Sequence, residues 1–598
     1  MNRYVDQLIQ IFGEQMDMSH KNVSFSPFYS DIGLGFRDRG LGINQLFLHY
    51  NRMTTELGLP FLQLEADGEE KVAQRSLLGV SQCQGEATVR IAFYEHNAWM
   101  VEAAGLKRLR FELCDSIFRE LRVFEENRIV TFDAYLPTIE RLKRDPDEWY
   151  PFSLGLYAVI GGLAPTIDEN GIVSVEVLPD DAGRIVLAFA EQHLEIDRAR
   201  LRETLLQAPD QASQAEVLTR KWLEEALGGF QIHTEEEWER GVLAKAVYAL
   251  LFNAAKPPGL FAGRVASFPA RGDYPTHYLW DSCFQNLALE QMEPRLAKDA
   301  LHLLIDNMRV DGKQPHFLCS TWIKPHHSQP PLVGWAGLRL VQERGDLVLA
   351  AKLLPALLRN TRWWLTQRMT RKGLIAALGG GETGWDNTPR FDHGPIIACD
   401  MNAYLLMQMR CSVELARLLG DEATALAAEE QADGYASVIR RVLYDEDANL
   451  FRDIRLETGE PLSVLTPASF LPLLVDVGLE EGKVRAMIER YLLNPNHFYG
   501  KYPFPSVAYD DPCYTPDNHW RGPIWLPIAY FMLEILRKYG YLQEAAEASD
   551  RLYRMIITDG DIRENFNSQT GEGLRSYQQG WTAAILLKLH AEREQLMV

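Results

Sequence analysis

From residue 235 onwards, apolar residues recur every three to four positions, and this pattern restricts the fold more than any other feature of the sequence. About eleven such segments occur, near residues 236–255, 283–308, 334–346, 351–369, 399–419, 423–442, 466–476, 480–492, 523–539, 542–557 and 578–594. Long loops rich in glycine and proline separate alternate pairs. Repeated helical hairpins with their loops at one end favour a closed (α/α)6 toroid, and the lack of a repeat of fixed period argues against an open solenoid.

Residues 23 to about 196 have a different texture, in which short runs rich in β-branched and aromatic residues alternate with turn signals such as Asp-Gly and Glu-Asn. The predicted strands span residues 23–29, 45–50, 87–94, 109–113, 121–124, 129–135, 154–162, 172–177 and 184–190. Many short strands at this spacing predict an antiparallel β-sandwich. No part of this region gathers carboxylates or histidines around glycines, so we expect it to serve packing or to shape the substrate site.

The length of 598 residues exceeds one ordinary hydrophobic core, so two domains are expected. Between the β-rich region and the helical region, residues 197–234 are predicted to be helical and are highly charged. Pro209 is predicted to break this stretch into two helices. We therefore predict a β-sandwich domain over residues 1–196, a helical linker over 197–234 and an all-α (α/α)6 toroid over 235–598.

The net charge and the cysteine content indicate which classes of binding partner are disfavoured and which cellular compartment is expected. The chain has 61 Lys and Arg against 82 Asp and Glu, a net charge of −21, which disfavours nucleic acid or an anionic membrane as a partner. Its seven cysteines are odd in number, scattered and without a C-x-x-C pair, as expected for reduced thiols in the cytosol. No apolar leader and no run of 18 apolar residues is present, so we predict a cytoplasmic protein.

A glycine-rich loop over residues 379–390 is the first candidate site. Four of the six residues from Gly379 to Gly384 are glycines, which excludes a helix interior and predicts a flexible loop. Asp386 follows, bracketed by Trp385, Asn387 and Arg390. An acid beside an indole suits a sugar-cleaving site, in which the ring supports a pyranose and the acid transfers a proton. The alternative is that Asp386 is an N-cap of the following segment.

Four further motifs gather aromatic and polar residues outside the helical periodicity. They lie at residues 277–282, 328–331, 517–525 and 562–582, and their candidate residues are Trp280, Asp281, Gln329, Trp520, Arg521, Glu564 and Trp581. Two tryptophans and an arginine between residues 520 and 525 are unusual for a core. The ordinary alternatives are that Asp281 caps a helix and that Glu564 is a surface glutamate.

Hydrolysis of a glycoside with inversion requires two carboxyl groups, an acid for the leaving oxygen and a base for a water molecule on the opposite ring face. Asp386 and Glu564 are the candidates, although they lie 178 residues apart. A toroid would bring them together, because all the loops on one side of such a fold face a common funnel.

Five motifs together resemble those of glycoside hydrolase family 63, which includes processing α-glucosidases and the mannosylglycerate and glucosylglycerate hydrolases. They are Tyr278-Leu-Trp-Asp281, Ser328-Gln-Pro-Pro331, Gly384-Trp-Asp-Asn-Thr-Pro-Arg390, Trp520-Arg-Gly-Pro-Ile-Trp525 and Glu564-Asn-Phe-Asn567 with Thr570-Gly-Glu-Gly573. The loop around Asp386 also resembles that of the family 37 trehalases. The resemblance covers residues 235–598, with an N-terminal β-sandwich of the expected type.

This resemblance implies an (α/α)6 barrel, cleavage of an α-linkage with inversion, Asp386 as general acid and Glu564 as general base. It also implies a sugar subsite, for which we predict Trp280, Asp281, Gln329, Trp385, Asn387, Arg390, Trp520, Arg521 and Trp581. The tryptophans could stack on sugar faces, while Asp281, Gln329 and Arg521 could bind ring hydroxyls. Arg390, Arg521 and Lys501 are candidate ligands for a glycerate carboxylate.

We expect a small carbohydrate substrate, most simply an α-glucoside, and no cofactor. We also expect no metal: His326 and His327 lack neighbouring ligands, although Asp510 and Asp511 could hold Ca²⁺ in a loop. The alternatives are a trehalase-like hydrolase or a phosphorylase on the same toroid, and a non-catalytic sugar-binding protein. Glu564 argues against a phosphorylase, which would use phosphate in place of the base.

Overall fold

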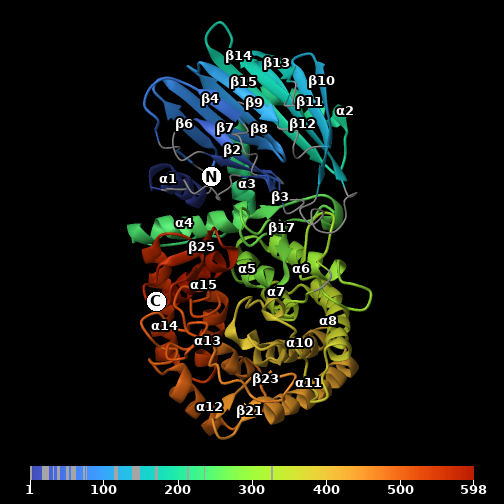
Figure 1. Cartoon of the computed structure of the whole chain (residues 1–598), viewed down its shortest axis with the longest axis vertical. Coiled ribbons are helices and arrows are strands. Elements are labelled where there is room, and N and C mark those ends of the chain that lie inside the picture. Colours follow the sequence, from blue (N-terminus) through green and yellow to red (C-terminus); the bar gives the residue numbers. More distant parts are fainter. Residues whose placement is uncertain are drawn as a thin grey trace. The chain divides into compact units, whose positions relative to one another are not determined.

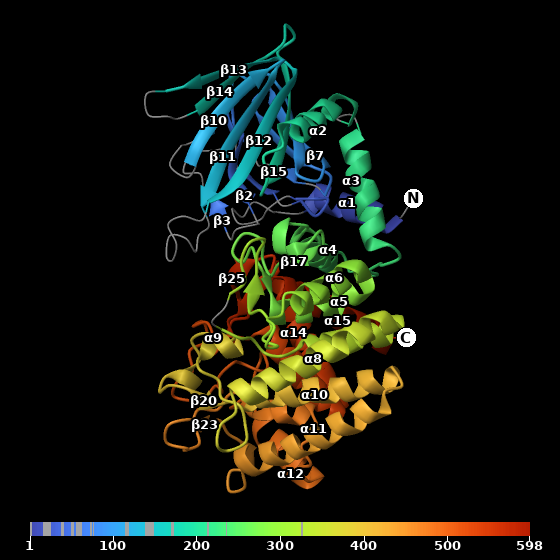
Figure 2. The ribbon, with the colours of Figure 1, turned by 90° about the vertical axis from the view of Figure 1, so that its right-hand side faces the viewer.

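The computed structural model falls into two compact units, Met1–Thr276 with Cys319–Trp322, and His277–Leu318 with Ile323–Val598. It describes residues 3–15, 26–30, 32–36, 41–48, 53–55, 62–71, 74–75, 77–113, 119–137, 149–168, 173–211, 214–234, 236–324 and 327–597. Strands dominate the first unit and helices the second (Figures 1 and 2). The division lies later than the predicted boundary at 234/235.

Two antiparallel sheets form most of the first unit. One sheet has the order β1-β2-β4-β9-β14-β13, with β3 on β2; its strands are β1 (Ile32–Phe36), β2 (Gly42–Leu48), β3 (Met53–Thr55), β4 (Leu62–Glu65), β9 (Arg108–Leu113), β13 (Gly162–Ile167) and β14 (Val173–Leu178). The other has the order β10-β11-β12-β15-β8-β7-β6-β5; its strands are β5 (Gln74–Arg75), β6 (Val80–Gln84), β7 (Ala87–Glu95), β8 (Ala98–Ala104), β10 (Arg119–Glu126), β11 (Ile129–Pro137), β12 (Trp149–Ile160) and β15 (Arg184–His193).

The two sheets pack face to face through aromatic side chains. The ring of Phe111 on β9 lies 5.5 Å from that of Phe132 on β11 and 6.0 Å from that of Phe189 on β15. This agrees with the predicted β-sandwich, and the alternating segment at 87–94 is strand β7. The first predicted strand is wrong where it can be compared: residues 26–30 form a turn, and residues 23–25 lie outside the described residues.

Among its described residues, the first unit has the α-helices α1 (Arg3–Gln15), α2 (Arg198–Gln211), α3 (Ala215–Leu227) and α4 (Glu237–Phe252). Helices α2 and α3, predicted as a linker, pack on the second sheet instead, where Leu201 and Leu205 join a buried cluster with Tyr94 and Met100. Helix α2 also continues through Pro209, where a break was predicted. The unit also contains two short strands that pair with each other, β16 (Ala254–Ala255) and β17 (Ala266–Ser267), and a 3₁₀ turn at Gly259–Phe261.

The second unit is built from helical hairpins. Its helices are α5 (Leu279–Met292), α6 (Pro294–Asp306), α7 (Val333–Arg344), α8 (Leu347–Gln367), α9 (Gly380–Thr383), α10 (Cys399–Leu418), α11 (Glu422–Leu443), α12 (Glu481–Met487), α13 (Leu526–Lys538), α14 (Leu542–Asp559) and α15 (Gly580–Met597). Short strands lie in its loops: β18 (His277–Tyr278), β19 (Phe317–Leu318), β20 (Ile396–Ile397), β21 (Tyr444–Asp445), β22 (Leu450–Phe451), β23 (Ile454–Arg455), β24 (Arg563–Phe566) and β25 (Gly573–Tyr577).

Helix contacts in this unit form a closed series. Helix α5 contacts α7, α7 contacts α10, α10 contacts the 3₁₀ helix Pro467–Leu474, this contacts α13, α13 contacts α15, and α15 contacts α5. Helices α5, α10 and α13 are buried at most positions, whereas α6, α8, α11 and α14 bury one face and contact these helices or α7 from outside. The segment predicted as an α-helix at 466–476 is instead a 3₁₀ helix over Pro467–Leu474, with Pro472 inside it.

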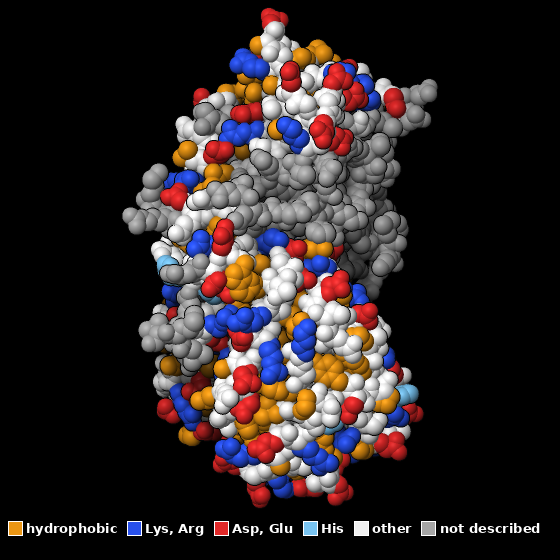
Figure 3. Space-filling view, turned by 90° about the vertical axis from the view of Figure 1, so that its left-hand side faces the viewer, with side chains coloured by type: hydrophobic (Ala, Val, Ile, Leu, Met, Phe, Trp, Pro, Cys, Tyr) orange, Lys and Arg blue, Asp and Glu red, His pale blue; other side chains and the backbone are white. Residues whose placement is uncertain are grey.

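Surface properties of the described residues add two facts. On the described part of the face in Figure 3, acidic and basic side chains are intermixed, without a continuous basic area. No described helix combines the length and apolar composition that crossing a membrane requires.

The packing of α2 on the sheet gives a test. A Cβ atom at Gly155 on β12 would lie 2.6 Å from Cδ1 of Leu205 and 3.2 Å from Cδ2 of Leu201. We expect Gly155→Ala to lower the free energy of unfolding by about 1–3 kcal/mol, because a packed core resists added volume. Gly162→Ala is the control, since its Cβ would meet only ordinary contacts at 3.8 Å or more. Denaturant unfolding measures both, and an unchanged stability of Gly155→Ala would contradict this packing.

Candidate active site

The glycine-rich loop is compact. Helix α9 is one turn, after which Gly384 turns the chain with φ +79° and the Trp385 N–H donates to the Gly380 carbonyl at 3.0 Å. The Asp386 carboxylate is 66% exposed. The next segment is a 3₁₀ turn at Pro389–Phe391 whose N-cap residue is Thr388, so the N-cap alternative for Asp386 is wrong.

Glu564 lies on β24 in a hairpin with β25 and is buried, contrary to the surface alternative. The Ser576 N–H donates to its carboxylate at 3.4 Å, and Nε1 of Trp581 donates to its backbone carbonyl at 3.1 Å. Two residues along, Phe566 exchanges backbone hydrogen bonds with Ile524 at 2.8 and 3.0 Å. This pair joins the Glu564 strand to the motif at residues 517–525.

Three carboxyl groups share one electrostatic environment. Asp281 lies in the first turn of α5, three positions after the N-cap residue Tyr278, and is 4% exposed. Burial raises the pKa of Asp281 well above its usual value, and the charges of Glu564 and Asp386 raise it further against the effect of a backbone N–H. Residues that are far apart in the sequence therefore converge, as the prediction of a shared site requires.

The tryptophans of the predicted subsite stack on one another. The rings of Trp385 and Trp520 lie 4.9 Å apart, those of Trp520 and Trp525 3.8 Å apart, and that of Trp280 about 6 Å from both Trp520 and Trp581. All five are at most 5% exposed. The indoles therefore pack chiefly on one another and form a buried framework that holds the loops together, and their contact with a sugar stays a prediction.

Gln329 fixes the start of α5. Its Oε1 accepts from the Trp280 N–H at 3.1 Å, and its Nε2 lies 3.4 Å from Nε2 of His316. Nδ1 of His316 in turn donates to the Ser328 carbonyl at 2.9 Å. Burial lowers the pKa of His316 to about 3, so the ring is neutral and Nε2 can accept from Gln329. The Gln329 amide is therefore engaged by protein, whereas we predicted that it binds sugar hydroxyls.

Asn387 and Arg521 also have protein partners. Oδ1 of Asn387 accepts from the Trp520 N–H at 2.8 Å, and its Nδ2 donates to Asn518 at 3.1 Å, so its predicted contact with substrate is replaced by a brace between two loops. Arg521 pairs with Asp392 but remains 26% exposed, so it can still reach a ligand.

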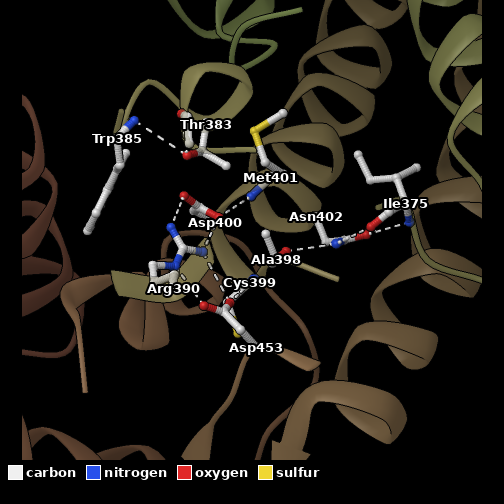
Figure 4. Close-up of polar contacts among 11 residues, drawn as sticks. Ile375, Thr383, Trp385, Arg390, Ala398, Cys399, Asp400, Met401, Asn402 and Asp453 are labelled. Carbon is white, nitrogen blue, oxygen red and sulfur yellow. Dashed lines mark hydrogen bonds and ion pairs between the residues drawn. The ribbon is translucent and has the colours of Figure 1, made fainter. Parts of the chain in front are cut away.

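Arg390 was predicted to bind the substrate, and the structure contradicts this. Its guanidinium is fully buried between Asp400 and Asp453 (Figure 4). Four hydrogen bonds of 2.6 to 3.1 Å join it to the two carboxylates. A side chain so enclosed cannot contact a sugar.

Comparison with known proteins places this site in a family. A family model described as the mannosylglycerate hydrolase MGH1-like glycoside hydrolase domain matches residues 274–582, just over half of the chain. The chain is a member of glycoside hydrolase family 63. It is thus a glycoside hydrolase, and the resemblance drawn from the five motifs is confirmed.

Relatives of this family 63 hydrolase include mannosylglycerate hydrolase MGH2 of Selaginella moellendorffii, which is 28% identical over an alignment of 402 residues that covers 54% of this chain and 81% of the relative. The glucosylglycerate hydrolase of Mycolicibacterium hassiacum is 22% identical over 52% of this chain and 91% of its own length. The solved structure of GH63 mannosylglycerate hydrolase from Thermus thermophilus in complex with glucose is 26% identical, with a TM-score of 0.51, and covers 59% of this chain and 100% of that one.

Sequence reasoning assigned no role to three residues of this hydrolase that lie in or beside the candidate motifs. Nε2 of His519 lies 3.7 Å from Oδ2 of Asp386. Asn565 and Gln579 are fully buried beside the Glu564 strand and α15, and among the described residues neither atom of either amide has a hydrogen-bond partner. Their positions next to Trp520, Glu564 and Trp581 are the signal that could have identified them.

The described residues contain no group of three or more His, Cys, Asp or Glu side chains arranged to hold a metal ion. The two residues considered for Ca²⁺ have other partners. Asp510 pairs with His497 at 2.8 Å, and Asp511 accepts from the Leu465 and Cys513 backbone N–H groups.

The packing of the loop predicts the effect of one methyl group. A Cβ atom at Gly384 would lie 2.5 Å from the Trp280 ring, at a backbone φ that disfavours side chains. We expect Gly384→Ala to reduce both activity and the free energy of unfolding, the latter by about 2 kcal/mol. Gly379→Ala is the matched control in the same loop, because its Cβ would meet nothing within 4 Å. Equal behaviour of the two variants in thermal unfolding and hydrolysis would contradict this geometry.

Proposed function

We propose that this family 63 hydrolase cleaves the α-glycosidic bond of a small glycosylglycerate with inversion, with Asp386 as general acid and Glu564 as general base. The convergence of their charges on Asp281 is the observation that carries the proposal. Inverting hydrolysis needs an acid and a base on opposite faces of the sugar, and two carboxyl groups from distant loops supply this pair.

The surroundings of the two groups support this division of roles. Asp386 is largely exposed on its loop, so its carboxyl group is accessible to a glycosidic oxygen. Glu564 is buried, and its carboxylate is held by the Ser576 N–H, which suits a base that must direct one water molecule. The buried amides of Asn565 and Gln579 supply donors and acceptors for that water or for sugar hydroxyls, since buried amides normally find partners.

Asp281 has a different role in this proposal. Burial and two neighbouring carboxylates raise its pKa well above the usual value, which favours the protonated form. A protonated carboxyl group donates a hydrogen bond, so Asp281 would bind a ring hydroxyl without adding a third negative charge. Arg521, a quarter exposed, and Lys501, which is exposed, are the remaining candidates for the glycerate carboxylate.

We further propose that the second unit is the predicted (α/α)6 toroid. Its inner ring would consist of α5, α7, α10, the 3₁₀ helix Pro467–Leu474, α13 and α15. The closed series of contacts among these elements supports the ring, as does the heavy burial of α5, α10 and α13. The candidate site residues lie in the first turns of α5 and α15 and in the segments that precede α7, α10, α13 and α15.

The choice of substrate follows the relatives. One is a mannosylglycerate hydrolase and another a glucosylglycerate hydrolase, so both an α-mannoside and an α-glucoside are candidates, and the simple α-glucoside expected from the sequence becomes a glycosylglycerate. We place the reaction in the cytoplasm, because the six described cysteines are free thiols.

Removing either carboxyl group tests the proposed roles. We expect Asp386→Asn and Glu564→Gln each to reduce kcat by about 10²–10⁴-fold, the usual contribution of general acid or base catalysis, without loss of the folded state. Glu572→Gln, an exposed residue of the same hairpin as Glu564, is the control and should retain activity. Steady-state kinetics with circular dichroism makes the comparison, and wild-type activity in either variant would refute the assignment.

Product analysis tests substrate and stereochemistry together. We expect α-mannosylglycerate, α-glucosylglycerate or both to be hydrolysed, and NMR to detect the β-anomer of the free sugar first, as inversion requires. An α-anomer formed first would point to retention. Activity on trehalose alone would favour the trehalase-like alternative, and dependence on phosphate would favour a phosphorylase. Binding of these sugars without turnover would favour a sugar-binding protein.

A further inference from the structure

The most enclosed ion cluster of the second unit lies directly beneath the loop that carries Asp386. Arg390 binds Asp400 through both terminal nitrogens at 2.7 and 2.8 Å, and Asp453 through Nε and one terminal nitrogen at 2.6 and 3.1 Å. Figure 4 shows the guanidinium between the two carboxylates, with Trp385 on the same side of α10. The side chains of Arg390 and Asp400 are fully buried, and Asp453 is 7% exposed.

Two carboxylates against one guanidinium leave a surplus negative charge inside the protein, and the N-terminus of α10 compensates it. The Met401 N–H donates to Asp400 at 2.9 Å, and the Cys399 N–H donates to Asp453 at 2.8 Å. These backbone groups are at the positive end of the dipole of a helix that spans Cys399–Leu418. Burial alone would lower the pKa of Arg390, but the two carboxylates raise it well above its usual value, so the charge is permanent.

The cluster ties three separate segments to each other. Arg390 belongs to the glycine-rich loop at residues 379–390 that carries Asp386, called the acid loop below. Asp400 belongs to the first turn of α10, and Asp453 lies between β22 and β23. A planar guanidinium with five donors can bind two carboxylates at fixed angles, which an ammonium group cannot do. The acid loop is therefore fixed in orientation as well as in place.

The connection to Asp386 runs through Trp385. The Arg390 guanidinium lies 5.1 Å from the centre of the Trp385 ring, and that indole is fully buried against Trp520. Asp386 follows Trp385 directly and its own carboxylate is largely exposed, so its position depends on the backbone around it.

We infer that Arg390, with Asp400 and Asp453, is a positioning residue for the proton donor: the ion cluster holds Trp385 and thereby aims the Asp386 carboxyl group at the glycosidic oxygen. The inference rests on the proposed function of Asp386. It assigns a catalytic consequence to a side chain that does not touch the substrate.

Dependence on the leaving group separates this role from a merely structural one. A glyceryl or other alkyl leaving group needs a proton as the glycosidic bond breaks, whereas fluoride from a glycosyl fluoride leaves with little assistance. A misplaced acid therefore slows hydrolysis of the alkyl glycoside selectively. General damage to the site slows both substrates, because the base and the sugar contacts serve both.

Two variants probe the cluster. Arg390→Lys keeps the charge but loses the planar fork, and Asp453→Asn removes one negative charge while keeping an oxygen that can accept from the Cys399 N–H. For both we expect kcat on the α-glycosylglycerate to fall about 10- to 100-fold, the scale of a misplacement near 1 Å. We expect KM to stay within about 2-fold, and turnover of the α-glycosyl fluoride of the same sugar to stay within about 3-fold, since binding and the base are untouched.

Arg410→Lys is the matched control, because Arg410 forms a 2.7 Å ion pair with Asp433 elsewhere on α10 and α11. It should leave both rates unchanged, and circular dichroism should show all variants folded. Should Arg390→Lys not fold, Asp453→Asn alone decides the question. Equal losses on both substrates, or no loss on either, would overturn the positioning role.

The Asp386→Asn variant, tested on the same two substrates, distinguishes a failure of the proposed role of Asp386 as acid from a failure of the positioning role of Arg390. A selective loss on the glycosylglycerate supports Asp386 as acid, and the behaviour of Arg390→Lys then tests the positioning role alone. An equal loss on both substrates would refute the acid assignment itself.

Discussion

The indole stack of Trp385, Trp520 and Trp525 is the interaction on which the candidate site depends. Each tryptophan buries roughly 150–250 Å² when it leaves water, and stacked pairs gain further from their geometry. Trp385 belongs to the acid loop, and Trp520 and Trp525 belong to the loop whose Ile524 pairs with the Glu564 strand. The burial of these rings therefore holds together two loops that the chain itself separates by more than a hundred residues.

Such a framework is needed because the groups it brings together repel one another. Two unit charges about 8 Å apart, a spacing that suits inversion, repel by about 2 kcal/mol at an effective dielectric constant of 20, and a third carboxylate would add to this cost. Asp281 relieves part of it, since its raised pKa favours the neutral form. The rest is offset by apolar burial around the site, so the polar arrangement that suits chemistry is stabilised by side chains that take no part in it.

The sequence predicted the β-sandwich, most helices and the segments that carry the site, because periodicity and loop motifs are local properties. It did not predict which side of a motif faces the substrate. Arg390 and Asn387 stand beside Asp386 in the sequence, yet one is enclosed by Asp400 and Asp453 and the other braces Asn518. The hydrogen-bond partners that engage these two side chains lie 10 to 131 residues away in the sequence, so a local sequence pattern cannot identify them. Helices α2 and α3 were misassigned for the same reason, since their charged residues concealed the apolar face that packs on the sheet.

The glycines of the acid loop show how a pattern can be identified correctly and explained wrongly. Their number predicts flexibility, but a Cβ atom at Gly380 would lie 2.3 Å from the Asp386 carbonyl, and one at Gly384 would strike the Trp280 ring. Glycine is required at these two positions, because backbone and indole approach too closely for any side chain. A loop packed so tightly on one side and anchored by Arg390 on the other has little freedom to move the acid. Its composition therefore reflects close packing around Asp386, and such packing would place the proposed proton donor precisely.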